Sequence, residues 1–303
     1  MKRGAYRTRC ARLEGTGMGR RYNAEGQLEL FAIAANTSDI RAKNVRELMT
    51  WSTFNISSRH KQSIKHEFGD KFLNVATSGK SIATWHDNDL LIFLTSHLVS
   101  SINAGEKTSP RIFFTGYEFF NFAKRGHVGG TRYTQIWDTL VRLHETSIHT
   151  NIDLANGDRL ESRWNWLPEI HRKTTRTGKA IGFEVLLADP VYRAINQSTP
   201  QVLTLDDRYF DFRSGFDKFL YMFARRSAGH DREWLVTEKL LHERSGSTLP
   251  ITQWRKLLVD TIEAGELADY KIKKAMIGRE KAVAFERSKY AAKKVHKATI
   301  TIE

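Results

Sequence analysis

The sequence predicts an α+β fold in which three helices followed by a β-hairpin occur twice. A helical apolar period recurs three times before residue 145, over residues 87–101, 115–124 and 131–144. The same order of patterns returns over residues 213–285. Each expected hairpin has a basic, glycine-containing turn, at residues 171–179 and 278–279. Three helices followed by a hairpin with a cationic turn are typical of a winged helix, so we expect two winged-helix domains in tandem.

The elements of the first domain are predicted by capping and periodicity. Apolar alternation over residues 71–85 favours a hairpin. The first helix begins after Asp87, which can serve as N-cap. The second opens with Thr115 and Glu118 at the spacing of a capping box. Strand-like patterns follow the third helix, over residues 147–154, 160–170 and 180–187.

In the second half, a helix around residues 191–197 follows Pro190, which ends the first unit. Three further helices are predicted over residues 213–228, 237–244 and 251–264. In the last of them Trp254, Leu257 and Leu258 should face inward. The closing hairpin pairs residues 270–276 with 281–285.

The expected organisation therefore has four parts. Residues 1–69 are a basic disordered N-terminus and an irregular preface, 70–189 the first winged helix, 190–287 the second, and 288–303 a basic C-terminal tail.

The charge is concentrated at the two ends of the chain. The net charge is +14, from 48 Lys and Arg against 34 Asp and Glu. Most of this excess lies in residues 1–21 and 271–303, which leaves the middle of the chain close to neutral. Such an arrangement favours a polyanionic partner, of which nucleic acid is the commonest in the cytoplasm, over a general solubilising charge.

Several classes of protein are excluded by the composition. The single cysteine, Cys10, can form no intrachain disulfide, and it points to a reducing cytoplasm. No apolar run is long enough to cross a bilayer, and the basic N-terminus lacks the apolar stretch of a secretory signal. The scattered histidines predict no metal site, and no cofactor motif is complete.

A set of short segments resembles the plasmid initiator family called replication initiator protein A, and the match extends from about Leu30 to Phe285. The segments are residues 82–93, 125–126 with 129–130, 146–152, 203–206 with 209–210, and 246–248. The resemblance implies a tandem winged-helix protein that binds repeated sites, called iterons, at a plasmid origin. It also implies that host helicase and initiator proteins complete origin opening. Dimerisation through the first domain, in a monomer–homodimer equilibrium, and repression of its own promoter are further implications. The chain departs from the family in its long basic tail and in residues 32–66, and no role is transferred to either segment.

The expected DNA contacts lie on the two recognition helices and their wings. They are Arg132, Gln135 and Arg142 on the first helix, Arg172, Lys173, Arg176 and Lys179 on its wing, Ser247, Gln253, Arg255 and Lys256 on or before the second helix, and Lys271, Lys273, Lys274 and Arg279 on its wing. The helix residues would read base edges in the major groove of double-stranded DNA, and the wing residues would hold phosphates.

The sequence leaves two alternatives to a non-enzymatic initiator to be tested against its motifs. A nicking initiator would use a tyrosine such as Tyr290 together with a metal-binding His-x-His pair, and the sequence contains no such pair. We therefore expect no catalytic activity. A winged-helix transcriptional regulator without initiation activity shares the expected fold, so it remains the alternative function.

Overall fold

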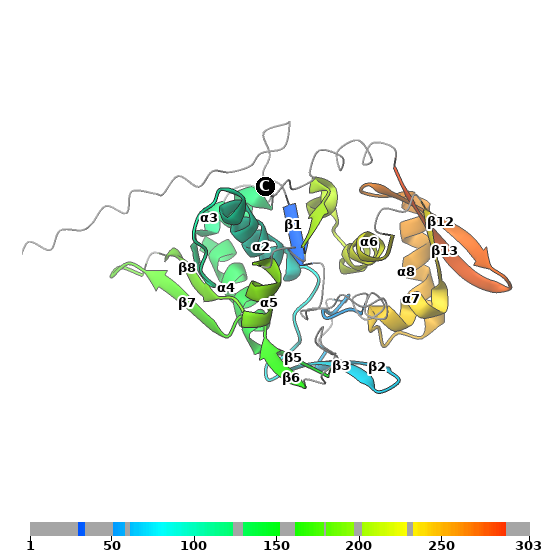
Figure 1. The fold of residues 1–303 in the computed structure, drawn as a ribbon, viewed down its shortest axis with the longest axis horizontal. Coiled ribbons are helices and arrows are strands. Elements are labelled where there is room, and N and C mark those ends of the chain that lie inside the picture. Colours follow the sequence, from blue (N-terminus) through cyan, green and yellow to red (C-terminus); the bar gives the residue numbers. More distant parts are fainter. Residues whose placement is uncertain are drawn as a thin grey trace, which may run out of the picture.

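The computed structural model describes residues 30–33, 51–57, 61–123, 130–151, 161–178, 180–196, 202–228 and 233–288. These residues form a mixed fold of helices and antiparallel sheets. Figure 1 shows an N-terminal half, residues 51–196, beside a C-terminal half, residues 202–288, with strand β1 standing between them. None of the helices in the described part combines the length and the apolar character that crossing a membrane requires.

The N-terminal half combines a group of helices with two antiparallel sheets. Its described helices are α2 (Asn88–Asn103), α3 (Gly116–Phe122), α4 (Gly130–Glu145) and α5 (Asp189–Ile195). One sheet has the order β2 (Ser63–Phe68), β3 (Lys71–Thr77), β5 (Thr146–Thr150), β6 (Ser162–Asn165). The other has the order β4 (Arg111–Phe114), β8 (Ala180–Leu186), β7 (Glu169–Thr174). The three helices predicted before residue 145 are thus confirmed.

A local sequence signal explains α3, whereas packing explains α2. Thr115 and Glu118 form the predicted capping box: the Thr115 hydroxyl accepts from the Glu118 N–H at 3.2 Å, and the Glu118 carboxylate accepts from the Thr115 N–H at 2.7 Å. Helix α2 is buried on nearly every side, because it packs against α3, α5 and β1 at the centre of the half. Its interior serines are tolerated because the hydroxyls bond within the helix, as Ser96 does to the Ile92 carbonyl.

The C-terminal half is a helical group packed on one four-stranded sheet. Its helices are the 3₁₀ turn η2 (Asp207–Asp211), α6 (Gly215–Ala228), α7 (Glu238–Ser245) and α8 (Ile251–Ala264). Its sheet has the order β10 (Glu233–Thr237), β13 (Glu280–Arg287), β12 (Tyr270–Ile277), β11 (Glu266–Leu267). The predicted helix over residues 251–264 and the closing hairpin are confirmed. Helix α7 begins after Thr237, whose hydroxyl accepts from the Leu240 N–H.

The two halves share one continuous hydrophobic core. Strand β1 (Leu30–Ile33) pairs antiparallel with β9 (Val202–Leu205) and packs against α2. The rings of Trp85 and Phe219, one from each half, lie 6.0 Å apart. Asp89 of α2 and Lys218 of α6 form an ion pair at 3.0 Å with side chains 0% and 1% exposed. The halves are therefore held together by apolar packing and by a buried charge pair.

Several expectations about strands need correction. Residues 71–85 do not fold back on themselves; β3 forms its hairpin with β2, through a turn at Gly69 with φ +60°. Strand β2 therefore lies inside the stretch expected to be an irregular preface, and Trp51 and Phe54 in the same stretch are buried core residues. The strand expected over residues 160–170 is divided, because β6 and β7 belong to different sheets.

The end of the first unit also differs from the expectation. Pro190 lies in the first turn of α5, where its missing N–H costs nothing. Val191 and Ile195 of that helix are fully buried, and α5 packs against α2, so this helix completes the N-terminal half. In α8, Leu257 is 37% exposed instead of inward, while Trp254 and Leu258 are buried as predicted. The basic N-terminus that was expected to be disordered and the tail from residue 289 lie outside the described residues.

Candidate nucleic-acid interface

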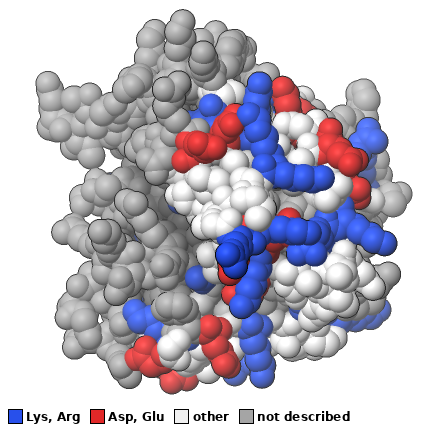
Figure 2. All heavy atoms as spheres, turned by 90° about the vertical axis from the view of Figure 1, so that its right-hand side faces the viewer, with Lys and Arg blue, Asp and Glu red and all other residues white. Residues whose placement is uncertain are grey.

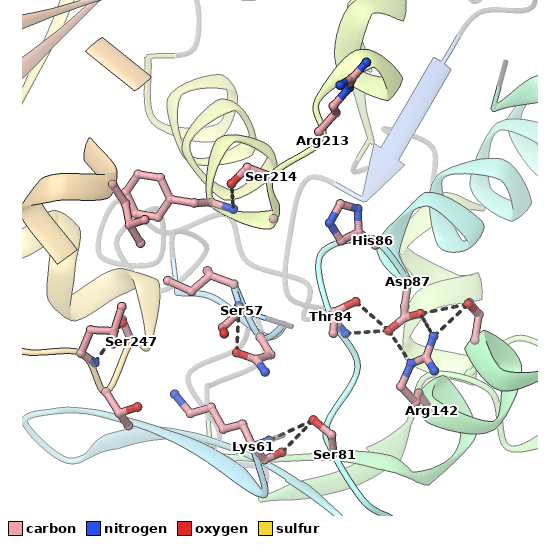
Figure 3. Close-up of a pocket in the computed structure, with 18 of the residues that line it drawn as sticks. Ser57, Lys61, Ser81, Thr84, His86, Asp87, Arg142, Arg213, Ser214 and Ser247 are labelled. Carbon is pink, nitrogen blue, oxygen red and sulfur yellow. Dashed lines mark hydrogen bonds and ion pairs between the residues drawn. The ribbon is translucent and has the colours of Figure 1, made fainter. Parts of the chain in front are cut away.

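Helices α4 and α8, the third helices of the two repeats, border one open cleft of about 1160 Å³ (Figure 3). Helix α4 lines it with Gln135, Asp138, Thr139 and Arg142, and the α8 region lines it with Ser247, Thr248, Leu249, Gln253, Lys256 and Leu257. The remaining wall comes from segments around residues 55–61, 81–87 and 213–216. The two helices predicted to read DNA thus face a common space, although about 110 residues separate them in the chain.

On α4 the predicted contacts have different surroundings. Gln135 is exposed and lines the cleft. Arg132 is half-buried, with its guanidinium 5.5 Å from the centre of the Phe120 ring. Arg142 is held by Asp87, to which its Nε and Nη2 donate at 2.9 and 2.6 Å. This hydrogen bond raises the pKa of Arg142 further above its usual value.

The Asp87 carboxylate is a buried acceptor that joins α4 to the start of α2. Besides Arg142, it accepts from the Thr139 hydroxyl and from the N–H and hydroxyl of Thr84. Its side chain is 2% exposed, against 35% for Arg142. Asp87 therefore precedes α2 as predicted, but its side chain makes no N-cap bond and holds α4 instead. Arg142 positions this helix, and part of its surface still lines the cleft.

Helix α8 shows the same division of roles. Gln253 and Lys256 are exposed and line the cleft. Arg255 is turned toward α7, where its Nε donates to Glu238 at 2.5 Å. Ser247 precedes the helix, and its hydroxyl accepts from the Leu249 N–H at 3.2 Å. Of the residues predicted on α8, Gln253 and Lys256 are thus the two presented to the cleft, and Arg255 ties α8 to α7.

The first hairpin, formed by β7 and β8, carries exposed cations at its turn. Arg172 and Arg176 are exposed. Lys173 is paired with Glu184 at 2.6 Å and lies 5.1 Å from the centre of the Phe113 ring. Lys179 lies outside the described residues. This hairpin therefore keeps Arg172 and Arg176 as solvent-facing cations.

The second hairpin, formed by β12 and β13, is the more strongly cationic. Lys271, Lys274 and Arg279 are exposed. Lys273 is paired with Glu286 across the strands at 2.7 Å. Figure 2 shows the end of the molecule that carries this hairpin and α8, where lysine and arginine side chains gather in a band with uncharged surface beside it. The band has the character of a phosphate-binding surface.

Two residues of the cleft were missed by the sequence reasoning. Lys61 lies in the stretch expected to be irregular, and its ammonium donates to the Gly246 carbonyl before α8. Burial lowers the pKa of Lys61 below its usual value. Arg213 lies before α6 and is exposed at the cleft. The only signal for it was its position beside Ser214, whose hydroxyl caps the helix by accepting from the Phe216 N–H.

The cleft therefore presents amide, ammonium and guanidinium donors, which suit phosphates and base edges. Within the described residues no group of three or more histidine, cysteine, aspartate or glutamate side chains could hold a metal ion.

The chain is similar to known proteins in sequence and in fold. The chain is 28% identical over 211 residues to a candidate replication protein of Wigglesworthia glossinidia brevipalpis, an alignment that covers 69% of this chain and 76% of that protein. Crystal structures of domains 2 and 3 of RctB resemble the fold with TM-scores of 0.54 and 0.50, at 11% and 9% identity. Each covers 80% of this chain and 98% or 97% of the other.

The family model for replication initiator protein A matches residues 43–272, which include α4, α8 and the cleft between them. The resemblance seen in the sequence is thus confirmed, and a role in initiating replication follows from it. The chain belongs to the replication initiator protein A family.

Proposed function

We propose that this protein is a plasmid replication initiator that binds origin iterons as double-stranded DNA through two tandem winged helices. The observation that carries the proposal is the shared cleft: α4 and α8 border it from opposite halves. Each helix is also followed along the chain by a hairpin with exposed cations. In a winged helix the third helix enters the major groove, and the hairpin contacts the adjacent backbone.

The exposed residues of the cleft carry the base contacts in this proposal. Gln253 can bond adenine in bidentate fashion, and Lys256 can donate to guanine or to a phosphate. Gln135 has the corresponding place on α4. Arg142 and Arg255 act by holding their helices at the required angle, because the guanidinium of each forms an ion pair with a carboxylate of its own half. The exposed wing residues Arg172, Arg176, Lys271, Lys274 and Arg279 bind phosphates.

The two halves have different roles in DNA binding and self-association. The C-terminal half carries most of the iteron affinity, and the N-terminal half adds DNA contacts and supports a monomer–homodimer equilibrium. The protein is not an enzyme. It acts in the bacterial cytoplasm together with host helicase and initiator proteins, and it represses its own promoter when it binds there.

The test uses duplexes selected by the wild-type protein from a random-sequence pool. Gln253→Ala should reduce binding to a selected duplex by about 1–3 kcal/mol, with a much smaller effect on random duplex. Glu263→Gln, an exposed change on α8 outside the cleft, is the matched control and should leave the preference intact. Equal losses on both DNAs would show that Gln253 reads no base.

A second measurement separates the initiator from a transcriptional regulator. The wild-type gene should sustain replication of a plasmid that carries the matching origin, and the Gln253→Ala gene should do so at reduced copy number. A protein that binds the selected duplex and represses a promoter, yet sustains no replication, would be the regulator.

A further inference from the structure

The turn of the second hairpin projects beyond the rest of its sheet. Strands β12 and β13 pair over their full length, from Tyr270 with Arg287 to Ile277 with Glu280. The neighbouring strand β10 covers β13 only from Ala282 onward. Residues 276–281, here called the wing tip, therefore extend past the sheet, and Figure 1 shows this hairpin reaching out at the edge of the molecule.

The wing tip is a tight turn. Gly278 and Arg279 form a two-residue loop, and Gly278 has φ +60°. A positive φ at the first central position is what a type II′ hairpin turn requires, and glycine meets it without strain. The side chains beside the turn are thus presented in a defined direction by paired strands.

Two apolar side chains at this tip are exposed to solvent. Met276 is 57% exposed and Ile277 is 42% exposed. As successive strand residues they point to opposite faces of the hairpin, so both sides of the tip are apolar. In the first hairpin the described turn residues, Thr175 to Gly178, are exposed and carry no large apolar side chain, although Ile181 on the following strand is 48% exposed.

The tip and its surroundings carry three cations and one acid, Glu280, which is the cross-strand partner of Ile277. Lys274, Arg279 and Lys281 are exposed, and Lys281 is the cross-strand partner of Met276. None of these three has a side-chain partner among the described residues. Arg279 lies at the turn itself, and Figure 2 shows the cations of this end around uncharged surface. A small apolar point flanked by cations fits a groove whose walls are phosphates, where the apolar faces of the bases become accessible once a base step is opened.

We propose that Met276 and Ile277 form an apolar wedge that enters the minor groove of the bound duplex and partly unstacks a base step. The inference rests on the proposed function, since it places the hairpin beside DNA held by α8. Proteins of other folds insert Met, Ile, Leu or Phe in this way and kink the duplex by about 20–90°. Lys274, Arg279 and Lys281 hold the phosphates on either side. An unstacked step lowers the cost of opening the neighbouring base pairs, which is the task of an initiator.

The experiment compares the full-length wild-type protein with M276S/I277S. The probe is a duplex selected by the wild type from a random pool, with 2-aminopurine placed at successive positions. Wild-type protein should raise the 2-aminopurine fluorescence at one step outside the α8 contact and should bend the duplex in a gel assay. The double variant should lose both signals while its affinity falls less than about tenfold and its sequence preference stays.

L235S is the matched control, because Leu235 is 43% exposed on β10 of the same sheet but away from the tip. It should keep both DNA signals. Circular dichroism and urea unfolding of all three proteins establish that the fold is unchanged, which the exposed positions favour.

The outcomes separate this inference from the proposed function. If selection yields no preferred duplex, the proposed function fails and the wedge fails with it. If the preference is present but wild type and M276S/I277S distort the duplex equally, or neither distorts it, the wedge alone is overturned. The wedge would also be overturned if M276S/I277S still distorts the duplex but no longer self-associates. The tip would then be a contact with a second copy of this chain.

Discussion

At the scale of single residues, His66 shows how a neutral polar group is held in the core. Its side chain is 6% exposed, its ring stacks on Trp51 at 5.2 Å, and its Nε2 lies 3.0 Å from the Ser52 carbonyl. Burial lowers the pKa of His66 from 6.5 to about 4. The imidazole therefore stays neutral in the folded protein at pH 7 and donates to the Ser52 carbonyl.

This residue makes stability depend on pH. The unfolded chain binds a proton at His66 below about pH 6.5, whereas the folded chain does so only near pH 4. The contribution of neutral His66 to the free energy of unfolding is thus complete above pH 6.5 and is lost as the pH falls toward 4. Between pH 7.5 and 5 we expect a loss of about 2 kcal/mol in the free energy of unfolding. His66→Gln, which keeps a donor for Ser52 but does not titrate, should remove this part of the pH dependence. Urea unfolding at the two pH values measures it, and the same pH dependence in both proteins would contradict it.

At the scale of elements, two helix ends use glycine for the same reason, and one of them has a second reason as well. Gly246 ends α7 with φ +62°, and Gly265 ends α8 with φ +77°. Both provide the left-handed residue that commonly closes a helix. An added Cβ at Gly265 meets nothing within 4 Å, but one at Gly246 would lie 2.6 Å from a methyl group of the buried Ile64. Gly246 therefore also sets how closely α7 approaches β2.

These two positions give a paired prediction. Gly265→Ala should lower the free energy of unfolding by about 1–2 kcal/mol, the cost of a left-handed side chain. Gly246→Ala should lower it by about 1–3 kcal/mol more, because Ile64 must move within the core. The extra loss should shrink when Gly246→Ala is combined with Ile64→Ala, which removes the contact. Urea unfolding of the wild type, the two glycine variants, Ile64→Ala and the double variant tests this, and equal effects of the two glycine changes would disprove the close approach.

At the scale of the whole molecule, the Asp89–Lys218 pair couples the two halves. Lys218 also lies 4.2 Å from the centre of the Tyr209 ring, so its charge is satisfied from two sides. Removing one partner of a buried pair leaves an uncompensated charge, so Lys218→Met should cost about 3–5 kcal/mol. The double variant Lys218→Met with Asp89→Asn should be less destabilised than Lys218→Met alone. A double-mutant cycle in guanidinium unfolding measures the coupling, and additive losses would show that the pair contributes none.

The basic tail allows a prediction from charge alone. Residues 289–303 contain four lysines and one acid. Each lysine that neutralises a phosphate adds about 0.9 to the slope of log affinity against log salt, so deleting residues 289–303 should flatten the slope by about 3–4. Specific and random DNA should lose affinity by similar factors. Filter binding over a salt series measures the slope, and an unchanged slope would leave the hairpin cations as the phosphate contacts.

Local signals in the sequence were enough to locate most of the helices and the two hairpins. The capping box at Thr115, the apolar stripe of residues 251–264 and the turn at Gly278 each act over a few neighbouring residues, so they can be recognised without knowledge of the fold. The family could be recognised for a similar reason, since its segments occur in a fixed order along the chain.

Only the tertiary structure decided which strands, helices and side chains lie against one another. Strand β2, helix α5 and the break between β6 and β7 depend on contacts between residues far apart in sequence, and no local period encodes such pairing. For the same reason the sequence could place Arg142 and Arg255 on outward helix faces but could not foresee Asp87 and Glu238 opposite them. The charge that looks available in a sequence is available to DNA only where folding pairs it with no carboxylate, as at Lys256, Lys274 and Arg279 within the described residues.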